Sequence, residues 1–240
     1  MPAAADPADP RTPLILLPGL LCDAALWAPQ VTALRDIADP VVADLTQDDS
    51  LGGMAERVLA TAPPRFALAG LSMGGYVALT LALRAPERVT RLALLDTNAR
   101  PDTFEQSERR RALMALAEAG RFAEVAPQLL PMLLTPAHQA DDTLARTVLD
   151  MAERIGPQAF VRQQTAIMTR PDRRRELGRI RCPTLVLCGR DDALTPPALH
   201  EEMRDGIRDA TLEVVDACGH LSPLEQPAAV TAALRAWLTA

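Results

Sequence analysis

A serine set between glycines is the residue of this chain best placed to do chemistry. Residues 70–74 read Gly-Leu-Ser-Met-Gly, follow the apolar run 66–69 and precede a segment of helical pattern that starts at Gly75. This is the G-x-S-x-G pattern in a strand–turn–helix context. Glycines flank the serine because side chains there would collide with the neighbouring strand and helix. The pattern predicts that Ser72 is an exposed nucleophile; a plain glycine-rich turn or a helix cap is the alternative.

Three histidines are candidates for the base that such a serine needs. A serine hydroxyl is a weak nucleophile at neutral pH unless a base, itself oriented by an acid, accepts its proton. His220 follows the last predicted strand and precedes the last predicted helix. His138 and His200 fall inside helical segments, where we expect exposed polar side chains. His220 is therefore the predicted base.

Carboxylates that follow apolar runs are candidates for the acid. The run 184–188 is followed by Gly-Arg-Asp-Asp-Ala-Leu-Thr-Pro, in which Asp191 and Asp192 are adjacent. The residues alone leave open which of the two is catalytic, because an aspartate there also closes a turn or caps a helix. Asp96, after the run 92–95, occupies a comparable loop and is interpreted as a structural or backup acid.

The order of apolar and helical segments predicts an α/β fold with a mostly parallel central sheet covered by helices. Short runs rich in Leu, Ile, Val and Ala, bounded by Gly, Pro and Asp, are typical of strands buried on both faces. The predicted strands are 12–17, 40–45, 66–71, 89–95, 184–188 and 210–215. The predicted helices are 50–62, 74–84, 197–206 and 222–238, with Ser50 and Ser222 as N-caps and Pro223 at the first helical position.

In the stretch 98–177 the alternation of strands and helices stops, and helical runs are separated by glycine and proline. It is too long for a structureless loop in a compact domain, so we expect a helical cap inserted into a core of residues 1–97 and 178–240. The arginine triplets 109–111 and 173–175 are interpreted as solvated helix surface. Apolar residues of the cap could line a pliable pocket, although most are expected only to pack: Met114, Leu116, Met132, Leu133 and Met168.

Length and composition are those of an ordinary globular protein. The chain has 240 residues, of which 48% are hydrophobic and 23% charged. Its formal charge of −6 disfavours nucleic acid and anionic membranes as partners. The longest apolar stretch, 14–22, is far shorter than the ~20 residues of a membrane span. Residues 1–11 are expected to be a disordered tail, and the acids and prolines at the start of this tail favour a cytoplasmic protein over a secreted one.

Neither a metal nor a cofactor is expected. The four cysteines, Cys22, Cys182, Cys188 and Cys218, form no C-x-x-C pair, and reduced thiols fit a cytoplasmic protein. The three histidines share no short spacing. The phosphate-binding pattern G-x-x-x-x-G-K-[ST] is absent, and the glycines of 70–75 lack the dinucleotide-binding spacing.

The serine, aspartate and histidine motifs together resemble those of the α/β-hydrolase fold family. The resemblance covers nearly the whole chain outside the tail and is weakest in the insertion. The passage 85–95 is similar to the family's link from the helix after the nucleophile to the next strand. The G-x-x-D loop at Gly189 and the Gly-His pair at His220 are also similar. The resemblance implies that Asp192, rather than Asp191, is the acid.

The segment 17–20 resembles the family's loop after the first conserved strand, where many members have a His-Gly pair; here Pro18 replaces that histidine. The resemblance implies an oxyanion hole formed by the backbone N–H groups of Leu20 and Met73. The string 18–27 also resembles a branch that includes stress-signalling and hormone-perceiving hydrolases as well as esterases. In that string, Cys22 is a candidate pocket residue, and Trp27 either lines the pocket or anchors the loop.

The predicted function is the hydrolysis of a carboxylic ester of a small, mostly apolar acid. In this prediction Ser72 attacks the acyl carbon, His220 transfers the proton and Asp192 orients the imidazole. Thioesters, lactones, amides, perhydrolysis and carbon–carbon bonds remain alternatives, as does a receptor or signalling protein with little turnover. A monomer or homodimer acting on a small-molecule acyl substrate is expected.

Overall fold

Six strands form one sheet in the computed structural model, which describes residues 11–240. All neighbouring strands are parallel, in the order β2-β1-β3-β4-β5-β6. The strands are β1 (Thr12–Leu17), β2 (Ala38–Val42), β3 (Phe66–Leu71), β4 (Val89–Leu95), β5 (Thr184–Gly189) and β6 (Ala210–Val215). The predicted parallel sheet is confirmed, and the tail predicted for residues 1–11 falls, except for Arg11, outside the described residues.

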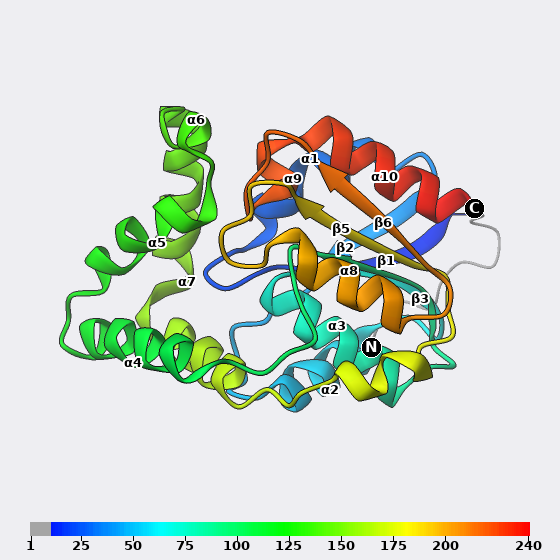
Figure 1. Ribbon diagram of the computed structural model, residues 1–240, viewed down its shortest axis with the longest axis horizontal. Coiled ribbons are helices and arrows are strands. Elements are labelled where there is room, and N and C mark those ends of the chain that lie inside the picture. Colours follow the sequence, from blue (N-terminus) through cyan, green and yellow to red (C-terminus); the bar gives the residue numbers. More distant parts are fainter. Residues whose placement is uncertain (1–10) are drawn as a thin grey trace.

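Helices cover both faces of this sheet (Figure 1). One layer comprises α2 (Leu51–Thr61), α3 (Met73–Arg84) and α8 (Pro197–Gly206), and the other comprises α1 (Ala28–Ala33), α9 (Ser222–Glu225) and α10 (Pro227–Thr239). Short 3₁₀ turns lie at η1 (Ala24–Trp27), η2 (Phe122–Glu124) and η3 (Arg174–Arg179). No helix of residues 11–240 is both long enough and apolar enough to cross a membrane.

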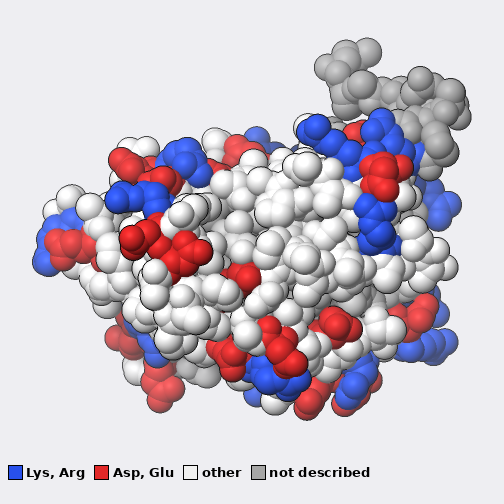
Figure 2. Space-filling model, turned by 90° about the horizontal axis from the view of Figure 1, so that it is seen from above, with Lys and Arg blue, Asp and Glu red and all other residues white. Residues whose placement is uncertain are grey.

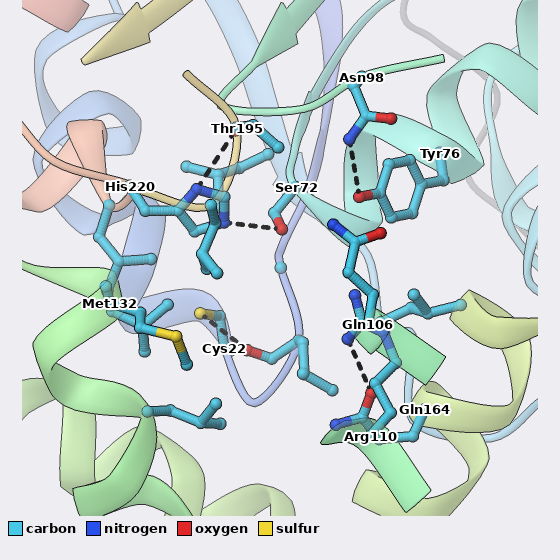
Figure 3. Close-up of a pocket in the computed structure, with 18 of the residues that line it drawn as sticks. Cys22, Ser72, Tyr76, Asn98, Gln106, Arg110, Met132, Gln164, Thr195 and His220 are labelled. Atoms are coloured by element: carbon cyan, nitrogen blue, oxygen red, sulfur yellow. Dashed lines mark hydrogen bonds between the residues drawn. The ribbon is translucent and has the colours of Figure 1, made fainter. Parts of the chain in front are cut away.

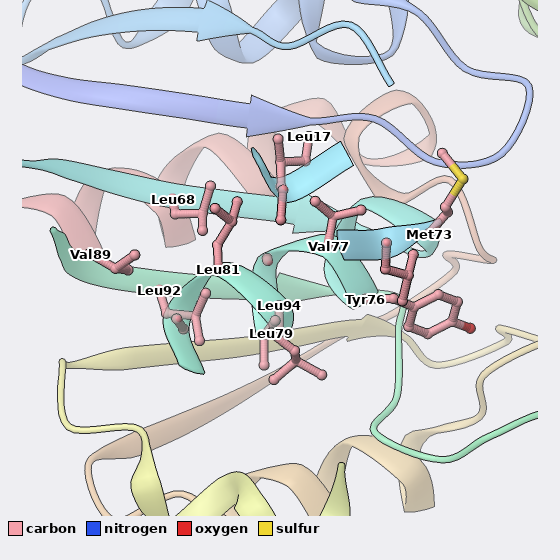
Figure 4. Close-up of a cluster of buried hydrophobic side chains, with 14 of the residues drawn as sticks. Leu17, Leu68, Met73, Tyr76, Val77, Leu79, Leu81, Val89, Leu92 and Leu94 are labelled. Carbon is pink, nitrogen blue, oxygen red and sulfur yellow. The ribbon is translucent and has the colours of Figure 1, made fainter. Parts of the chain in front are cut away.

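Alternating side chains of the strands pack into two separate cores, because successive residues of a strand point to opposite faces. On one face, Leu68 of β3 and Leu92 and Leu94 of β4 share a buried cluster with Val77 and Leu81 of α3 (Figure 4). Burying an aliphatic side chain of this size contributes roughly 1.5–3 kcal/mol. The centre of the sheet, where β3 and β4 end, is therefore a rigid base for the loops that follow.

The opposite face carries a second buried cluster, which combines small and large apolar side chains. Ala67, Ala69 and Ala93 of the central strands share a buried cluster with Trp27 of η1 and Leu234 of α10. Trp27 is fully buried and has no place in the pocket described below, so it anchors its loop against the core.

The edge strand β2 differs from its prediction. Strand β2 begins at Ala38 and ends at Val42, whereas the sequence suggested 40–45. Pro40 is accommodated because β2 pairs only with β1 and its other edge is open. The chain leaves the sheet soon afterwards, where the carboxylate of Asp44 accepts hydrogen bonds from the backbone N–H and the hydroxyl of Thr46. This side-chain turn ends the strand before residue 45.

The C-terminal helical segment also differs from its prediction. The single helix predicted over 222–238 is broken at Gln226, which precedes Pro227 and has the non-helical angles φ −133° and ψ 62°. Ser222 does not cap α9: it is the first residue of that helix, and its hydroxyl donates to Asp96 instead. Ser50 does cap α2, since its hydroxyl oxygen accepts from the N–H of Gly53 at 3.1 Å.

The segment between β4 and β5 is helical, as the sequence suggested. It contains α4 (Phe104–Glu118), α5 (Val125–Leu133), α6 (Pro136–Gln139) and α7 (Asp142–Met168), and Figure 1 shows these helices beyond the carboxyl ends of the strands. Helix α7 is kinked at Gly156, whose φ is 75°, and the next residue is Pro157. The helices share a small core that includes Leu113, Phe160 and, from the loop after β1, Leu21. That the segment is a separate cap with boundaries at 98 and 177 stays a prediction.

Charges are mixed on the face of the molecule drawn in Figure 2. Arginine and acidic side chains alternate around an uncharged central area, so this face carries no extended patch of one sign.

Candidate active site

Ser72 lies on a strained turn between β3 and α3. Its backbone angles are φ 53° and ψ −114°, a region that residues with side chains rarely adopt. A Cβ atom on Gly70 would lie 2.3 Å from the carbonyl oxygen of Gly74, and one on Gly74 would lie 2.2 Å from the carbonyl oxygen of Leu17. The glycines are therefore required by the close approach of backbone to backbone, as the sequence pattern suggested.

Neighbouring strand β4 holds this turn in place. The N–H of Ser72 donates to the carbonyl oxygen of Leu95 at 3.0 Å. The hydroxyl of Thr97 donates to the carbonyl oxygen of Ser72 at 2.8 Å. A side chain on Gly75 would overlap Thr97, with the closest contact at 2.5 Å. The strain at Ser72 is thus maintained by contacts on both sides of the turn.

The structure brings the three predicted catalytic side chains together. Ser72 Oγ lies 2.9 Å from His220 Nε2, although the two residues are 148 positions apart (Figure 3). His220 Nδ1 lies 2.8 Å from Asp192 Oδ2. Asp191, in contrast, is exposed, so Asp192 is the aspartate that contacts the imidazole.

The carboxylate of Asp192 is surrounded by donors. Its Oδ1 accepts from the N–H groups of Leu194 and Thr195, and its Oδ2 accepts from the hydroxyl of Thr195 at 2.6 Å. Burial by itself would raise the pKa of Asp192, but the charge and hydrogen bond of His220 and these donors hold it below its usual value. Asp192 is therefore ionised at neutral pH.

The contact between Asp192 and His220 shifts the pKa of His220 in the opposite direction. Burial favours its neutral form, but the charge of Asp192 and the hydrogen bond to it raise the pKa of His220 above its usual value. With Nδ1–H donated to Asp192, Nε2 of the neutral ring is the acceptor that faces Ser72. This is the tautomer that a general base for the serine requires.

A second buried acidic residue, Asp96, lies near Asp192 and His220. Asp96 follows β4, is fully buried and has a φ of 45°. It accepts hydrogen bonds from the N–H of Gly189 at 3.0 Å and from the N–H and hydroxyl of Ser222. Burial, followed by the charge of Asp192, raises the pKa of Asp96 to about 8. These contacts connect the ends of β4 and β5 with α9. That Asp96 is a backup acid stays a prediction.

The other two histidines are not exposed polar residues, so that expectation is wrong. His200 is fully buried, its Nε2 accepts from the N–H of Thr97 at 3.0 Å, and burial lowers its pKa to about 4. His138 is partly buried, with Nδ1 2.8 Å from Glu225 Oε2. A helical pattern places a residue on a helix, but the packing of that helix decides which face is buried.

Glu225 is a site-supporting residue that the sequence reasoning missed. Its Oε1 accepts from the N–H groups of Gly219 and Leu221, on either side of His220. Its Oε2 accepts from the N–H of Thr135 at 2.9 Å and contacts His138. One buried carboxylate therefore connects the His220 loop with the helical segment between β4 and β5. An acidic residue five positions after the histidine, within an otherwise apolar stretch, was the available signal.

The segments that carry the predicted oxyanion hole meet at Ser72. A Cβ atom on Gly19 would lie 3.5 Å from Ser72 Cβ, so the loop after β1 contacts the turn. Met73 is the first residue of α3, and neither its N–H nor that of Leu20 donates a hydrogen bond within residues 11–240. Their use for an oxyanion stays a prediction.

A cavity of about 100 Å³ opens beside Ser72 and His220 and has two unlike sides (Figure 3). In Figure 3, Cys22 and Met132 lie on one side, and Tyr76, Asn98, Gln106, Arg110 and Gln164 lie on the other. The remaining lining includes the apolar residues Leu71, Leu113, Leu129, Leu133, Leu194 and Leu221 and the arginines Arg109 and Arg170. Burial raises the pKa of the Cys22 thiol to about 12, so this thiol is neutral.

The lining agrees with one expectation about the helical segment and corrects part of another. Of the apolar candidates, Met132 and Leu133 line the cavity, whereas Met114, Leu116 and Met168 do not, as expected for most of them. In the triplet 109–111, Arg109 and Arg111 are exposed as expected, although Arg109 also lines the cavity, whereas Arg110 is half-buried at the cavity. Positions 106, 109, 110 and 113 share one face of α4, and that face turns toward the cavity. Arg174 and Arg175 of the other triplet are exposed.

No group of three or more His, Cys, Asp or Glu side chains within residues 11–240 is arranged to hold a metal ion. The described cysteines are free thiols.

Comparisons with known proteins agree with this architecture. A family model described as alpha/beta hydrolase fold matches residues 43–227. A Variovorax paradoxus (strain S110) protein named "Putative carbamate hydrolase RutD" is 32% identical, with 92% of this chain and 89% of that protein covered. A protein of the same name from Azorhizobium caulinodans is 30% identical, with 87% and 84% covered.

Solved structures are also similar. A thermophilic esterase from Thermogutta terrifontis, solved with malate bound, has a TM-score of 0.85 and 30% identity, with 95% of this chain and 89% of that chain covered. The enol-lactonase from Burkholderia xenovorans LB400 has a TM-score of 0.89 and 24% identity, with 99% and 95% covered. At that identity, the second likeness is one of fold.

Proposed function

Because the chain belongs to the α/β-hydrolase fold family, we propose that it is a serine hydrolase that cleaves a carboxylic ester, or a related acyl bond, of a small molecule. Ser72 is the nucleophile, His220 the base and Asp192 the orienting acid in this proposal. The observation that supports it is the continuous contact from Ser72 Oγ to His220 Nε2, at 2.9 Å, and from His220 Nδ1 to Asp192 Oδ2, at 2.8 Å.

The first half of the proposed reaction forms an acyl-enzyme. His220 Nε2 takes the proton of Ser72 while Ser72 Oγ forms a bond to the acyl carbon. The carbonyl oxygen becomes an oxyanion, which the N–H groups of Leu20 and Met73 stabilise. His220 then gives its proton to the leaving oxygen, the bond to the alcohol breaks and the acyl group remains on Ser72. Asp192 stays ionised throughout and stabilises the imidazolium.

The second half releases the acid. A water molecule loses a proton to His220 Nε2 and attacks the acyl carbon, which gives a second oxyanion in the same place. The bond to Ser72 Oγ breaks as His220 returns the proton to that oxygen. The products are a carboxylic acid and the free hydroxyl of Ser72. The fixed position of Ser72 on its strained turn allows both halves to use one arrangement of donors.

A carbamate is a second candidate substrate, because curated relatives that are 32% and 30% identical carry the carbamate hydrolase name. A carbamate carbonyl can be attacked by the same serine. An O-phenyl carbamate would lose its phenol as an ester loses its alcohol and leave a carbamoyl group on Ser72, which water would release as a carbamic acid that decomposes to an amine and carbon dioxide. The ester proposal draws its own support from the Thermogutta terrifontis esterase, which is 30% identical.

The proposal is tested with short-chain p-nitrophenyl esters, a phenyl carbamate and a fluorophosphonate probe. We expect sustained turnover of at least one substrate and labelling of Ser72. Ser72→Ala should abolish labelling and lower kcat by up to ~10⁶. Ser107→Ala, a serine on α4 whose side chain makes no hydrogen bond in the described residues, is the matched control and should retain activity.

Other outcomes would overturn the proposal. Equal turnover by wild type and Ser72→Ala would exclude Ser72 as the nucleophile. A single slow acylation without turnover would favour the receptor alternative over an enzyme. Turnover of the carbamate but not of the esters would move the proposal to the carbamate bond.

A further inference from the structure

One side of the cavity presents a buried donor without an acceptor. Gln164 of α7 is fully buried and lines the cavity. Its Oε1 accepts a hydrogen bond from Arg110 at 2.9 Å, which fixes the orientation of the amide. Its Nε2 has no hydrogen-bond partner in the described residues. Buried polar groups are nearly always paired, so this N–H₂ group points to a ligand that supplies the acceptor.

The side-chain amides of Asn98 and Gln106 likewise use their oxygen atoms within the protein. The Oε1 atom of Gln106 accepts from the N–H of Thr103 at 2.9 Å, and the Oδ1 atom of Asn98 accepts from the N–H of Arg100 at 2.8 Å. Their acceptor atoms are thus used inside the protein, and their N–H₂ groups remain. Asn98 makes one long contact, 3.4 Å, to the hydroxyl of Tyr76. Figure 3 shows Asn98, Gln106 and Gln164 on the same side of Ser72.

Arginines give this side of the cavity an excess of positive charge. Arg110 and Arg170 share the buried carboxylate of Asp102, at 2.7 Å and 2.5 Å. Arg170 is fully engaged, because it also donates to backbone carbonyls and lies over the ring of Tyr76. Arg109 has no carboxylate partner within residues 11–240, and its guanidinium contacts Met132 Sδ at 3.5 Å. Three guanidinium groups therefore face one carboxylate.

We propose that these residues form a binding site for a carboxylate on the substrate. The site, here called the donor wall, consists of Asn98, Gln106, Arg109, Arg110 and Gln164. This inference rests on the proposed function: the substrate is an ester that carries a second, free carboxylate, with the ester carbonyl at Ser72. A carboxylate offers only acceptors, which matches a wall that offers only donors, and arginine is suited to bind it.

The competing occupants fit less well. A purely apolar acyl chain would leave the Nε2 of Gln164 unpaired and would bury charge beside hydrocarbon. A neutral amide would satisfy some donors but would bring donors of its own and no negative charge. A hydrocarbon portion next to the ester can still contact the apolar side, which Met132 and Leu133 help to form.

The test compares three esters of similar size: monoethyl succinate, ethyl succinamate and ethyl butyrate. We expect kcat/KM for monoethyl succinate to exceed the values for the two neutral esters at least tenfold. Gln164→Glu keeps an oxygen for Arg110 but replaces the free N–H₂ with a second oxygen. It should lower the ratio of kcat/KM for monoethyl succinate over ethyl butyrate at least tenfold. Arg111→Gln, on the outer face of α4, should leave that ratio unchanged.

A binding measurement separates this inference from the proposed catalysis. Succinate should raise the melting temperature of the Ser72→Ala variant, which has no nucleophile, but not that of the Ser72→Ala, Gln164→Glu double variant; succinamide should have no effect on either. If no ester is hydrolysed but succinate binds in this pattern, the proposed function fails and the carboxylate site stands. If the esters are hydrolysed with equal kcat/KM, or Gln164→Glu leaves both the ratio and succinate binding unchanged, the carboxylate site is wrong.

Discussion

The two sides of the reaction cavity differ in how completely their polar groups are paired. After the ends of β3, β5 and β6, the side chains of Ser72, His220, Asp192 and Thr195 are hydrogen-bonded to one another. On the donor wall, Gln164 retains an unpaired N–H₂ group. In the proposed function, the reacting groups are therefore arranged before any substrate arrives, whereas the proposed carboxylate site would be completed by its ligand.

The two sides also rest on different supports. The catalytic side stands on strands whose residues are buried on both faces, such as β3 and β5. The donor wall is drawn mainly from α4 and α7, which share a smaller core with α5 and with Leu20 and Leu21 of the loop after β1. A rigid base suits groups that must keep reacting atoms within a few tenths of an ångström.

Removing the charge of Asp192 should break the catalytic side. We expect Asp192→Asn to lower kcat by ~10³–10⁴, because the amide no longer stabilises the imidazolium or selects the tautomer of His220. Asp191→Asn is the matched control, since that side chain is exposed, and should stay within about threefold of wild type. Steady-state kinetics of both variants check this, and the reverse order would refute the assignment of the acid.

Replacing Glu225 should loosen the connection between the two sides. Its Oε1 serves the His220 loop through Gly219, and its Oε2 serves Thr135 and His138 of the helical segment. Glu225→Gln keeps one acceptor but turns an N–H₂ group toward one pair of donors. We expect a loss of roughly 3 kcal/mol in the free energy of unfolding, since buried donors lose their partner. Urea unfolding measures this change.

The control for that experiment is Glu201→Gln, an exposed glutamate on α8, for which we expect a change within about 0.5 kcal/mol. Equal effects of the two substitutions would show that Glu225 does not join the regions. Amide hydrogen exchange adds a local readout: exchange at Thr135 should accelerate in Glu225→Gln and remain unchanged in Glu201→Gln.

Because His200 is buried, the free energy of unfolding should decrease in acid. Its pKa is about 4 in the folded protein and near 6.5 in an unfolded chain, so the unfolded state binds more protons between these values. The stability contributed by the neutral ring is present above pH 6.5 and is lost as the pH falls toward 4. At pH 5 the loss amounts to about 2 kcal/mol.

This effect is measured by urea unfolding of wild type and His200→Gln between pH 5 and 8. Glutamine retains an acceptor for the N–H of Thr97 but does not titrate, so the difference in unfolding free energy between the two proteins should shrink as the pH falls. Parallel curves would mean that His200 does not couple to stability.

The fall of kcat/KM at acidic pH should result from protonation of His220 and not from the residues of the donor wall. The base must be neutral, and Asp192 raises the pKa of His220 above its usual value of about 6.5. We expect kcat/KM to fall about tenfold per pH unit below that pKa. Amides and arginines do not titrate in this range, so ethyl butyrate and monoethyl succinate should give the same limb down to about pH 5.5. Below that pH, the carboxyl group of monoethyl succinate, with an ordinary pKa of about 4.3, begins to be protonated and its kcat/KM should fall more steeply. A limb seen only with the carboxylated ester would contradict this assignment.

Local signals in the sequence were sufficient for most of the core. The strands Thr12–Leu17, Phe66–Leu71, Val89–Leu95 and Ala210–Val215 match their predicted bounds, because continuous apolar runs between turn residues are properties of short segments. The signal for the turn at Ser72 is also local, since its glycines are required by close backbone contacts around the turn. Strand β2 was misplaced because an edge strand is partly polar and its bounds depend on pairing with β1.

What the sequence could not specify is which side chains meet across long separations. Ser222 resembled a cap but donates to Asp96, 126 positions away, and His200 resembled a surface residue but is buried under the β4 loop. Arg110 resembled a solvated charge but is half-buried, because the packing of α4 places it at the cavity.

The parallel sheet and the strained serine turn could be predicted from the sequence, because glycine spacing and apolar runs act over a few residues. The roles of Ser72, Asp192 and His220 as nucleophile, acid and base stay predictions. Only the tertiary structure decided that Glu225 joins the histidine loop to the helical segment and that Gln164 faces the cavity with an unpaired donor. These outcomes depend on which faces of the helices are buried, and packing between distant segments sets those faces.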